Sequence, residues 1–386
     1  MGQFASRDGP EKADWGWIGT KEYLYNQITR QRESVPPNPN VNLNGCTILI
    51  TGATGDLGLE VTKQLLNGRP TKIILAVRDT KRGEKVKANL LEQQKAQFEE
   101  HEKTDQPRPA IIEVKRLDQA DFTSVQELAE HIRGEPLDVV ILNSAMTKWE
   151  WELTKDDGYE EMYQVNYLST VLLAVLLLPA LRTEANTRQS HTSPVPLSPR
   201  LVFVSSDGVS NTLLPTAVIP GYNDPASLQS NAEADPHPSP RPILNFMSGP
   251  ENYRWLVRYN DTKLLLLLFA RHLSTLIPAD QCIISSVHPG FIITNLIRNG
   301  FFAMRYLGTS WFARRFVARP LDQGAASIVN AAVVKGNESH GCYMSESKIR
   351  EPTAFIRSEE GRRMQEQVYQ ETVGLLREVV GKDLLL

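Results

Sequence analysis

The chain contains 386 residues, its composition is ordinary for a soluble globular protein, and its formal net charge is -3 at pH 7. A chain of this length can bury a sizeable hydrophobic core. Because the charge is close to zero, we expect no nucleic-acid partner and no other polyanionic partner. The three cysteines are widely spaced, with no CxxC or Cys/His pattern. This spacing argues against a disulfide framework or a metal site and favours a reducing, cytoplasmic compartment.

Residues 1–45 are predicted to form an N-terminal extension and linker. They lack the apolar run of a secretory signal, so no export is expected. The mixed aromatic and aliphatic residues of "DWGWIGTKEYLYNQITRQ" favour a helix docked on the domain surface over a membrane-surface anchor. The prolines of "SVPPNPNVNLNG" then predict an irregular lead into the first strand.

From residue 46 onward, short runs rich in Val and Ile alternate with stretches of helical periodicity. Runs that are apolar on both faces are typical of a parallel sheet covered by helices on both sides. Strands are predicted at 47–50, 72–77, 110–114, 137–142, 200–205 and 281–288, and helices at 57–67, 81–102, 121–133, 158–183 and 256–276. This alternation predicts a doubly wound α/β sheet, the Rossmann fold, whose ligand site lies beyond the carboxyl ends of the strands.

We expect one catalytic domain over residues 46–350, with a closing helix region at 351–386. The stretch "LSTVLLAVLLLPAL" at 168–181 is shorter than the roughly 20 residues that cross a bilayer, so it predicts a buried helix and no transmembrane segment. The Ser-, Thr- and Pro-rich residues 184–199 are expected to form a surface excursion. The Pro- and Asn-rich insertion 207–255 follows a strand end, which favours a lid over the site.

The segment "TILITGATGDLGLEVTKQLL" combines a buried strand, a glycine-spaced turn and a helix. Gly52, Gly55 and Gly58 allow the backbone to turn tightly and approach a pyrophosphate, and the start of the helix offers free N–H groups. We predict that Thr54 and Leu57 of this turn also contact a dinucleotide. A tight connection without a ligand is the alternative, but the strand before and the amphipathic helix after favour nucleotide binding.

The next strand ends in "VRDTKRGEK". An arginine at this point accommodates the 2′-phosphate of NADP, whereas a carboxylate binds the ribose hydroxyl of NAD. Arg78 occupies the tip of the strand, with Lys81 and Arg82 close by, so NADP is the predicted cofactor. Asp79 keeps NAD as the less favoured alternative.

Later in the chain, "YNDTK" places Tyr259 one helical turn before Lys263. By spacing alone, such a pair is more often part of a solvated helix face. Here the pair opens an apolar helix and follows a strand that ends in Ser205 and Ser206. This context favours a reaction centre.

Eight segments occur in an order that resembles the short-chain dehydrogenase/reductase family, from about residue 45 to about residue 300. They are "TGATGDLG", "LAVRD", "RLDQAD", "LNSAM", "QVNYLS", "VFVSSDG", "YNDTK" and "HPGFIITNL". The chain is most similar to the retinol-dehydrogenase-like branch and to reductases of fungal secondary metabolism. The resemblance implies an oxidoreductase that interconverts a ketone and a secondary alcohol with NAD(P).

The resemblance also implies catalytic roles for matching residues. Tyr259 would exchange a proton with the substrate oxygen, and Lys263 would stabilise its phenolate form, because an unperturbed tyrosine has a pKa near 10. Ser206 would position the substrate carbonyl, with Ser205 as the neighbouring candidate. Asn166 would hold a water in the proton relay.

On the cofactor side, the resemblance implies that Tyr259 and Lys263 also bind the cofactor, with Lys263 on the nicotinamide ribose. It implies four further contacts. Asp118 would contact the adenine ring, and Asn143 would support the central strand beside the cofactor. Ile292 and Thr294 would contact the nicotinamide end. His288 is expected to pack beside the cofactor edge rather than to act in catalysis.

Several motifs depart from the family pattern. Gly55 comes three residues after Gly52, and Asp56 takes an expected glycine position, a spacing that resembles the extended branch of epimerases and dehydratases. "NSAM" brings Met146 in place of a glycine, and "YNDTK" stands for the usual "YSASK". Two alternatives therefore remain open, an extended-branch enzyme and a catalytically silent nucleotide-binding protein for regulation or scaffolding. The intact catalytic set favours an active oxidoreductase.

The partners expected are a substrate and a second copy of the chain. Apolar residues of the insertion predict a lipophilic small-molecule substrate, which the fungal resemblance narrows to a polyketide- or terpenoid-like compound. These residues are Leu213, Leu214, Ile219, Tyr222, Phe246, Met247 and Trp255. The helices at 158–183 and 256–276 correspond to helices that pair across subunit interfaces in the family. Their length and apolarity predict a homodimer, with a monomeric core as the alternative.

Overall fold

The computed structural model describes residues 35, 38, 39, 41–100, 109–187, 198–212, 214–219, 242–294, 318–351, 353–381 and 384. The helix predicted within residues 1–45, most of the excursion at 184–199 and residues 220–241 of the insertion lie outside this part of the chain. The division into an extension, a catalytic domain and a closing region stays a prediction.

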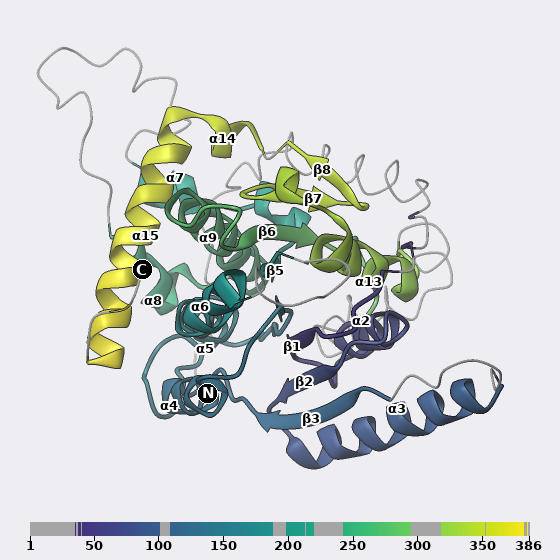
Figure 1. The fold of residues 1–386 in the computed structure, drawn as a ribbon. Coiled ribbons are helices and arrows are strands. Elements are labelled where there is room, and N and C mark those ends of the chain that lie inside the picture. The colour runs from purple at the N-terminus through teal and green to yellow at the C-terminus, as the bar shows by residue number, and fades with distance from the viewer. Residues whose placement is uncertain are drawn as a thin grey trace, which may run out of the picture.

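Eight strands form one sheet in the order β3-β2-β1-β4-β5-β6-β7-β8 (Figure 1). They are β1 (Thr47–Thr51), β2 (Lys72–Val77), β3 (Ile111–Arg116), β4 (Val139–Leu142), β5 (Arg200–Val204), β6 (Ile283–His288), β7 (Tyr343–Ser345) and β8 (Lys348–Arg350). Neighbouring strands run parallel except β7 and β8. The sheet confirms the predicted doubly wound fold. Strand order reverses between β1 and β4, and such a point opens a ligand crevice beyond the strand ends.

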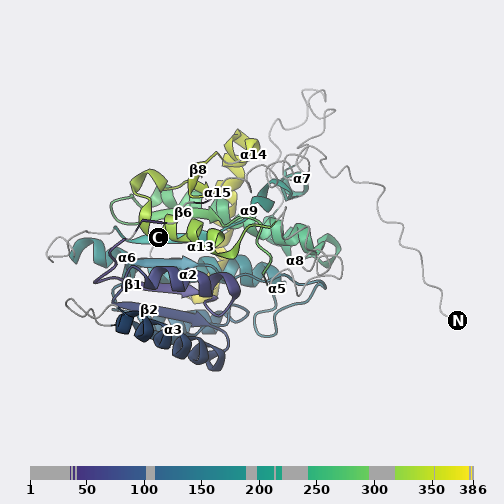
Figure 2. The ribbon, with the colours of Figure 1, turned by 90° about the vertical axis from the view of Figure 1, so that its right-hand side faces the viewer.

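Helices cover both faces of the sheet (Figures 1 and 2). The longer ones are α2 (Asp56–Leu66), α3 (Thr80–Glu100), α4 (Phe122–Ile132), α6 (Ser169–Thr187), α9 (Trp255–Leu276), α13 (Leu321–Val329) and α15 (Glu359–Val380). The shorter ones are α5 (Glu161–Tyr163), α7 (Leu214–Val218), α8 (Ile243–Ser248) and α14 (Ala354–Arg357). The 3-10 turns are η3 (Asp207–Ser210), η4 (Pro250–Asn252) and η6 (Asn337–Ser339), and the π-helical turns are η1 (Gln164–Leu168) and η5 (Asn330–Val334).

Both faces of the central strands are buried. Ile48 and Ile50 of β1 pack toward α2, α3 and α13, whereas Leu49 packs toward α4, α6, α9 and α15. Successive side chains of a strand point to opposite faces, so a strand with helices on both sides needs apolar residues at every position. This packing explains the continuous apolar runs in the sequence.

The helix predicted at 158–183 is divided in the structure. α5 is followed directly by the π-helical turn η1, and α6 continues from it. In this turn the N–H of Ser169 donates to the carbonyl of Gln164, five residues earlier. The Val165 carbonyl accepts a hydrogen bond of 3.0 Å from the side chain of Gln119. π-Helical turns are often found at functional sites.

The stretch Glu161–Leu181 is long and apolar enough to cross a membrane by length and composition alone. However, 78% of its apolar window is buried inside the protein. α6 packs against α4, and η1 packs against α9. Such burial is typical of a helix in the core of a folded domain.

α9 is buried on nearly all sides. The leucines Leu264–Leu268 are at most 1% exposed, and α15 packs against the helix (Figure 1). Phe269 of α9 stacks on Tyr369 of α15, with 5.6 Å between the ring centroids. The apolar helix faces that predicted a homodimer are therefore covered within one chain. The homodimer stays a prediction, and this burial supports the monomeric alternative.

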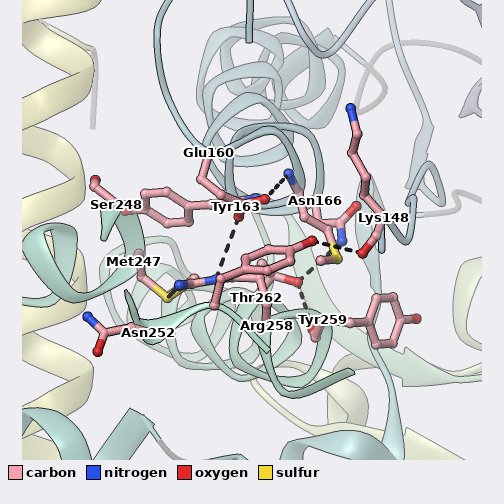
Figure 3. Close-up of polar contacts among 12 residues, drawn as sticks. Lys148, Glu160, Tyr163, Asn166, Met247, Ser248, Asn252, Arg258, Tyr259 and Thr262 are labelled. Atoms are coloured by element: carbon pink, nitrogen blue, oxygen red, sulfur yellow. Dashed lines mark hydrogen bonds and ion pairs between the residues drawn. The ribbon is translucent and has the colours of Figure 1, made fainter. Parts of the chain in front are cut away.

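A buried ion pair joins Glu160, just before α5, to Arg258 of α9 (Figure 3). Neither side chain is exposed to solvent, and Arg258 Nε lies 3.7 Å from Glu160 Oε2. The carboxylate also accepts the N–H groups of Met162 and Tyr163, both at 2.9 Å. Arg258 Nη1 contacts Met247 Sδ of α8 at 2.7 Å. Burial raises the pKa of Glu160, whereas these N–H donors and Arg258 lower it. The carboxylate therefore needs these partners to stay charged in the interior.

Removing one partner of this pair should destabilise the protein. Arg258→Met leaves the Glu160 carboxylate buried without its cation, which should lower the free energy of unfolding by about 3–5 kcal/mol. The control is Arg363→Met, because the Arg363 and Glu359 side chains are largely solvent-exposed and such pairs contribute less than about 1 kcal/mol. Urea denaturation measures both variants. If Arg258→Met lowers the free energy of unfolding no more than Arg363→Met does, the buried pair is not important for stability.

Candidate active site

A cavity of about 210 Å³ opens at the carboxyl ends of the central strands. Its walls come from the segments that follow β4, β5 and β6 and from the first turns of α9. Seven of the catalytic and cofactor-binding residues predicted from the sequence line it, among others: Leu57, Asn143, Ser206, Tyr259, Lys263, Ile292 and Thr294. The fold therefore gathers predicted catalytic and nicotinamide-end residues from distant parts of the chain around one space.

Lys263 contributes a buried amino group to this cavity. Its Nζ donates a hydrogen bond of 2.8 Å to the carbonyl of Val204, at the end of β5. Burial lowers the pKa of Lys263 to about 8. Nζ lies 5.7 Å from the ring centroid of Tyr259, one turn earlier on α9. When protonated, this group favours the phenolate form of Tyr259, which proton exchange near neutral pH requires.

Ser206 faces the same cavity from the end of β5. Its Oγ accepts a hydrogen bond of 3.1 Å from the N–H of Gly208. A hydroxyl that accepts from the backbone still has its own hydrogen, which can be donated to a substrate oxygen. The hydroxyl of Ser205 instead donates to the carbonyl of Lys263 at 3.4 Å. Ser206 is therefore better placed than Ser205 to bind a ligand.

Asn166 is not among the described residues that line the cavity, and its side chain makes polar contacts with neighbouring segments (Figure 3). Its Oδ1 accepts the N–H of Met146 at 2.7 Å. Its Nδ2 donates to the Met146 carbonyl at 2.9 Å and to the Thr262 hydroxyl at 3.3 Å. The side chain thereby joins η1 to α9 and to the segment after β4. With both amide hydrogens engaged, only acceptor capacity is left on this side chain, and its predicted contact with a relay water stays a prediction.

The glycine turn after β1 has a shape that fits a pyrophosphate. Gly52 has a positive φ of 67°, and a Cβ on Gly58 would lie 2.4 Å from the Gly52 carbonyl oxygen. Gly55 is the N-cap of α2, and no side-chain hydrogen bond from this residue caps the helix. The first N–H groups of a helix have no partners within the helix, so they can bind an anion.

Asn143 supports this turn from the neighbouring strand. Its Nδ2 donates to the Thr51 carbonyl at 3.0 Å, and its backbone N–H donates to the Thr51 hydroxyl at 2.9 Å. A Cβ on Gly58 would also lie 2.9 Å from Asn143 Nδ2. Asn143 thus ties the end of β4 to β1, and its position beside a bound cofactor stays a prediction.

The residues predicted to contact the adenosine part of the cofactor follow β2 and β3. Arg78 is exposed at the end of β2. Asp79 accepts a hydrogen bond of 3.0 Å from the N–H of Arg82 at the start of α3. The Arg82 guanidinium donates to the Thr54 carbonyl in the glycine turn at 2.8 Å. Asp118 follows β3, whose carboxyl end lies at the same edge of the sheet.

The end of the insertion reaches the cavity. Trp255 and Leu256 line it, and Trp255 packs on Trp149 with 5.1 Å between the ring centroids. Four other apolar residues proposed to contact a substrate pack in or against the hydrophobic core: Leu214, Ile219, Phe246 and Met247. Leu213 and Tyr222 lie outside the described residues. The function of the insertion as a lid stays a prediction.

Comparisons with known proteins agree with this architecture. The short chain dehydrogenase family profile matches residues 46–189. The short chain dehydrogenase yanD of Aspergillus niger is 34% identical over 88% of this chain and 93% of its own. The short chain dehydrogenase macD of Penicillium terrestre is 32% identical over the same shares. The chain belongs to the short-chain dehydrogenase/reductase family.

Membership of this family confirms the predicted class of enzyme, an NAD(P)-dependent oxidoreductase. An uncharacterised protein from Mycobacterium paratuberculosis has a similar solved structure, with a TM-score of 0.56 and 21% identity. The match covers 90% of this chain and 97% of that one. At this level of identity the likeness supports the fold alone.

Two asparagines of the cavity were not predicted as site residues. Asn211 and Asn260 both line it, and the signal for Asn260 is the departure of "YNDTK" from "YSASK". His288 also lines the cavity. Its Nδ1 accepts the N–H of Asp207 at 3.2 Å, and its Nε2 lies 3.3 Å from the Asp207 carboxylate. The packing role of His288 stays a prediction.

The buried amino group of Lys263 should make stability depend on pH. Its folded-state pKa of about 8 lies below its ordinary value of 10.5, so between these values the unfolded chain binds more protons. The contribution of this group to the free energy of unfolding therefore increases as the pH rises through this window. Lys263→Met should remove that contribution, as measured by denaturation without cofactor at about pH 8 and about pH 10. An identical pH dependence in variant and wild type would contradict the assignment.

Proposed function

We propose that the protein is an NADP-dependent reductase that interconverts a ketone and a secondary alcohol on an uncharged, lipophilic small molecule. The observation that carries the proposal is the convergence of the Tyr259 phenol, the Ser206 hydroxyl and the buried Lys263 amino group on one cavity. The cysteine pattern supports a reducing, cytoplasmic location.

Three residues of the chain together bind the substrate oxygen and transfer the proton. A bound nicotinamide supplies the hydride that forms the new C–H bond. Ser206 donates a hydrogen bond to the substrate oxygen, where negative charge develops. Tyr259 gives its proton to the same oxygen, which completes the alcohol, and protonated Lys263 stabilises the phenolate that remains. The reverse steps oxidise an alcohol.

The surroundings of the glycine turn support NADP over NAD. The Asp79 carboxylate, which would bind the ribose hydroxyl of NAD, caps the start of α3 instead. Arg82 reaches the glycine turn at Thr54, and Arg78 adds a second positive charge at the end of β2. Two guanidinium groups at this place favour the extra phosphate of NADP.

The lining of the cavity supports an uncharged and lipophilic substrate. Phe291, Trp255 and Leu256 supply apolar surface, and no Asp, Glu or Arg occurs among the described residues that line the cavity. A cationic substrate would lose its hydration there without gaining an ion pair from an acidic residue, and the Lys263 amino group, which also lines the cavity, is assigned to the stabilisation of Tyr259. The fungal origin of the relatives agrees with a polyketide- or terpenoid-like substrate in secondary metabolism, which we include in the proposal.

Tyr259→Phe tests the reaction. The substitution keeps the ring but removes the proton donor, so turnover of a ketone should fall at least about 10²-fold. NADPH affinity, followed by cofactor fluorescence, should change less than about twofold. The control is Tyr369→Phe on α15, which should keep wild-type turnover. A variant at position 259 that is as active as wild type would exclude the phenol as proton donor.

Arg82→Ala tests the cofactor preference. Loss of one charge-assisted hydrogen bond should raise the Kd for NADPH roughly tenfold, while the Kd for NADH changes less than about twofold. Lys85→Ala is the control, because Lys85 is an exposed cation on the same helix. Fluorescence titration of the three proteins with both cofactors measures the six dissociation constants. Tighter binding of NADH than of NADPH by the wild type would contradict the preference.

A further inference from the structure

Two groups that bind the substrate oxygen in the proposed function come from different elements. Ser206 follows β5, whereas Tyr259 belongs to α9. Both can reach one oxygen only if the turn after Ser206 is fixed relative to α9, since small displacements of catalytic groups are costly. Contacts that fix this turn come from the two residues that follow Tyr259.

Asn260 lies against the turn that follows Ser206. The residue is 7% exposed, and its Nδ2 donates a hydrogen bond of 3.0 Å to the Asn211 carbonyl. A Cβ on Gly208 would lie 2.1 Å from Asn260 Oδ1, so the amide packs directly against this glycine. The N–H of Gly208 in turn binds Ser206 Oγ at 3.1 Å. Asn260 thus holds the backbone group that orients the serine hydroxyl.

Asp261 holds the next part of the same segment. It is 1% exposed and accepts a hydrogen bond from the Thr212 hydroxyl. Thr212 Oγ1 accepts the N–H of Leu214 at 3.1 Å, at the start of α7. The other end of the segment is held separately, because the Asp207 carboxylate accepts a hydrogen bond from the Tyr343 hydroxyl of β7. The turn is therefore fixed at both ends, and α9 fixes one of them.

We propose that Asn260 and Asp261 are positioning residues that hold the Ser206 turn in register with Tyr259, so that both hydroxyl groups meet one substrate oxygen. The inference rests on the proposed function, because it assumes that this oxygen is bound by Ser206 and Tyr259. The positioning role also explains why "YNDTK" replaces "YSASK" in this chain. Serine and alanine at positions 260 and 261 are too short to make the contacts seen here.

A double-mutant cycle between Asn260 and Ser206 tests the proposal. Wild type, Asn260→Ser, Ser206→Ala and the double variant are compared by kcat for a ketone that the wild type reduces, and by Kd for NADPH. The matched control is Asn330→Ser. Asn330 is 8% exposed, and its Nδ2 hydrogen-bonds Asn38 at 3.1 Å, outside the described lining of the cavity.

Asn260→Ser should lower kcat about tenfold, the equivalent of one net hydrogen bond, and change the Kd for NADPH less than about twofold. In the Ser206→Ala background, the same substitution should change kcat less than about twofold, because no hydroxyl remains to be positioned. Asp261→Ala should resemble Asn260→Ser. Asp261→Asn keeps an acceptor for Thr212 and should therefore retain most of the wild-type rate.

Two results would overturn the positioning role. One is an equal loss of kcat from Asn260→Ser in the wild-type and Ser206→Ala backgrounds, which would show that Asn260 does not act through the serine. The other is a loss of kcat in Asn260→Ser that is no larger than the loss in the control Asn330→Ser. If Ser206→Ala itself keeps full turnover, the proposed function of Ser206 is wrong, and that result is distinct from a failure of the coupling.

Discussion

Burial of α9 is the constraint on which the site depends. Near its start this helix carries five polar side chains into the interior of the protein: Arg258, Asn260, Asp261, Thr262 and Lys263. A buried polar group without a partner is costly, so each of these side chains needs one. Their partners are the same elements that form the site: Glu160 before α5, Asn211 and Thr212 after Ser206, and the Val204 carbonyl of β5. The same contacts therefore stabilise the fold and hold the catalytic side chains in place.

The sheet was predicted more closely than the turns that join its elements. β2 begins and ends where the apolar run at 72–77 predicts, because burial on both faces demands such a run. The π-helical turn η1 was not predicted, since apolar periodicity cannot distinguish its wider hydrogen bonding from that of an α-helix. β8 was also missed. Its turn from β7 uses Glu346 and Ser347 at φ values of 51° and 59°, where Asn and Gly would give a recognisable signal.

Site residues also differ in how far they could be predicted from the sequence. The glycine turn and the Tyr259 and Lys263 pair belong to local motifs, so a short stretch of sequence is enough to select them. The contact of Asn260 with Asn211 joins α9 to the first residues of the insertion, 49 residues earlier in the chain, and no local pattern records it. Likewise, the sequence places Arg82 in a basic cluster but does not show that its guanidinium reaches Thr54.

The position of α15 in the chain has a consequence for biosynthesis. This helix covers α9, yet it follows β6, α13, β7 and β8 in sequence. During translation, the leucines of α9 leave the ribosome long before the helix that shields them. A nascent chain that pauses in this interval presents an apolar ridge to chaperones and to other nascent chains. Docking of the last helix is therefore the step that ends this exposure.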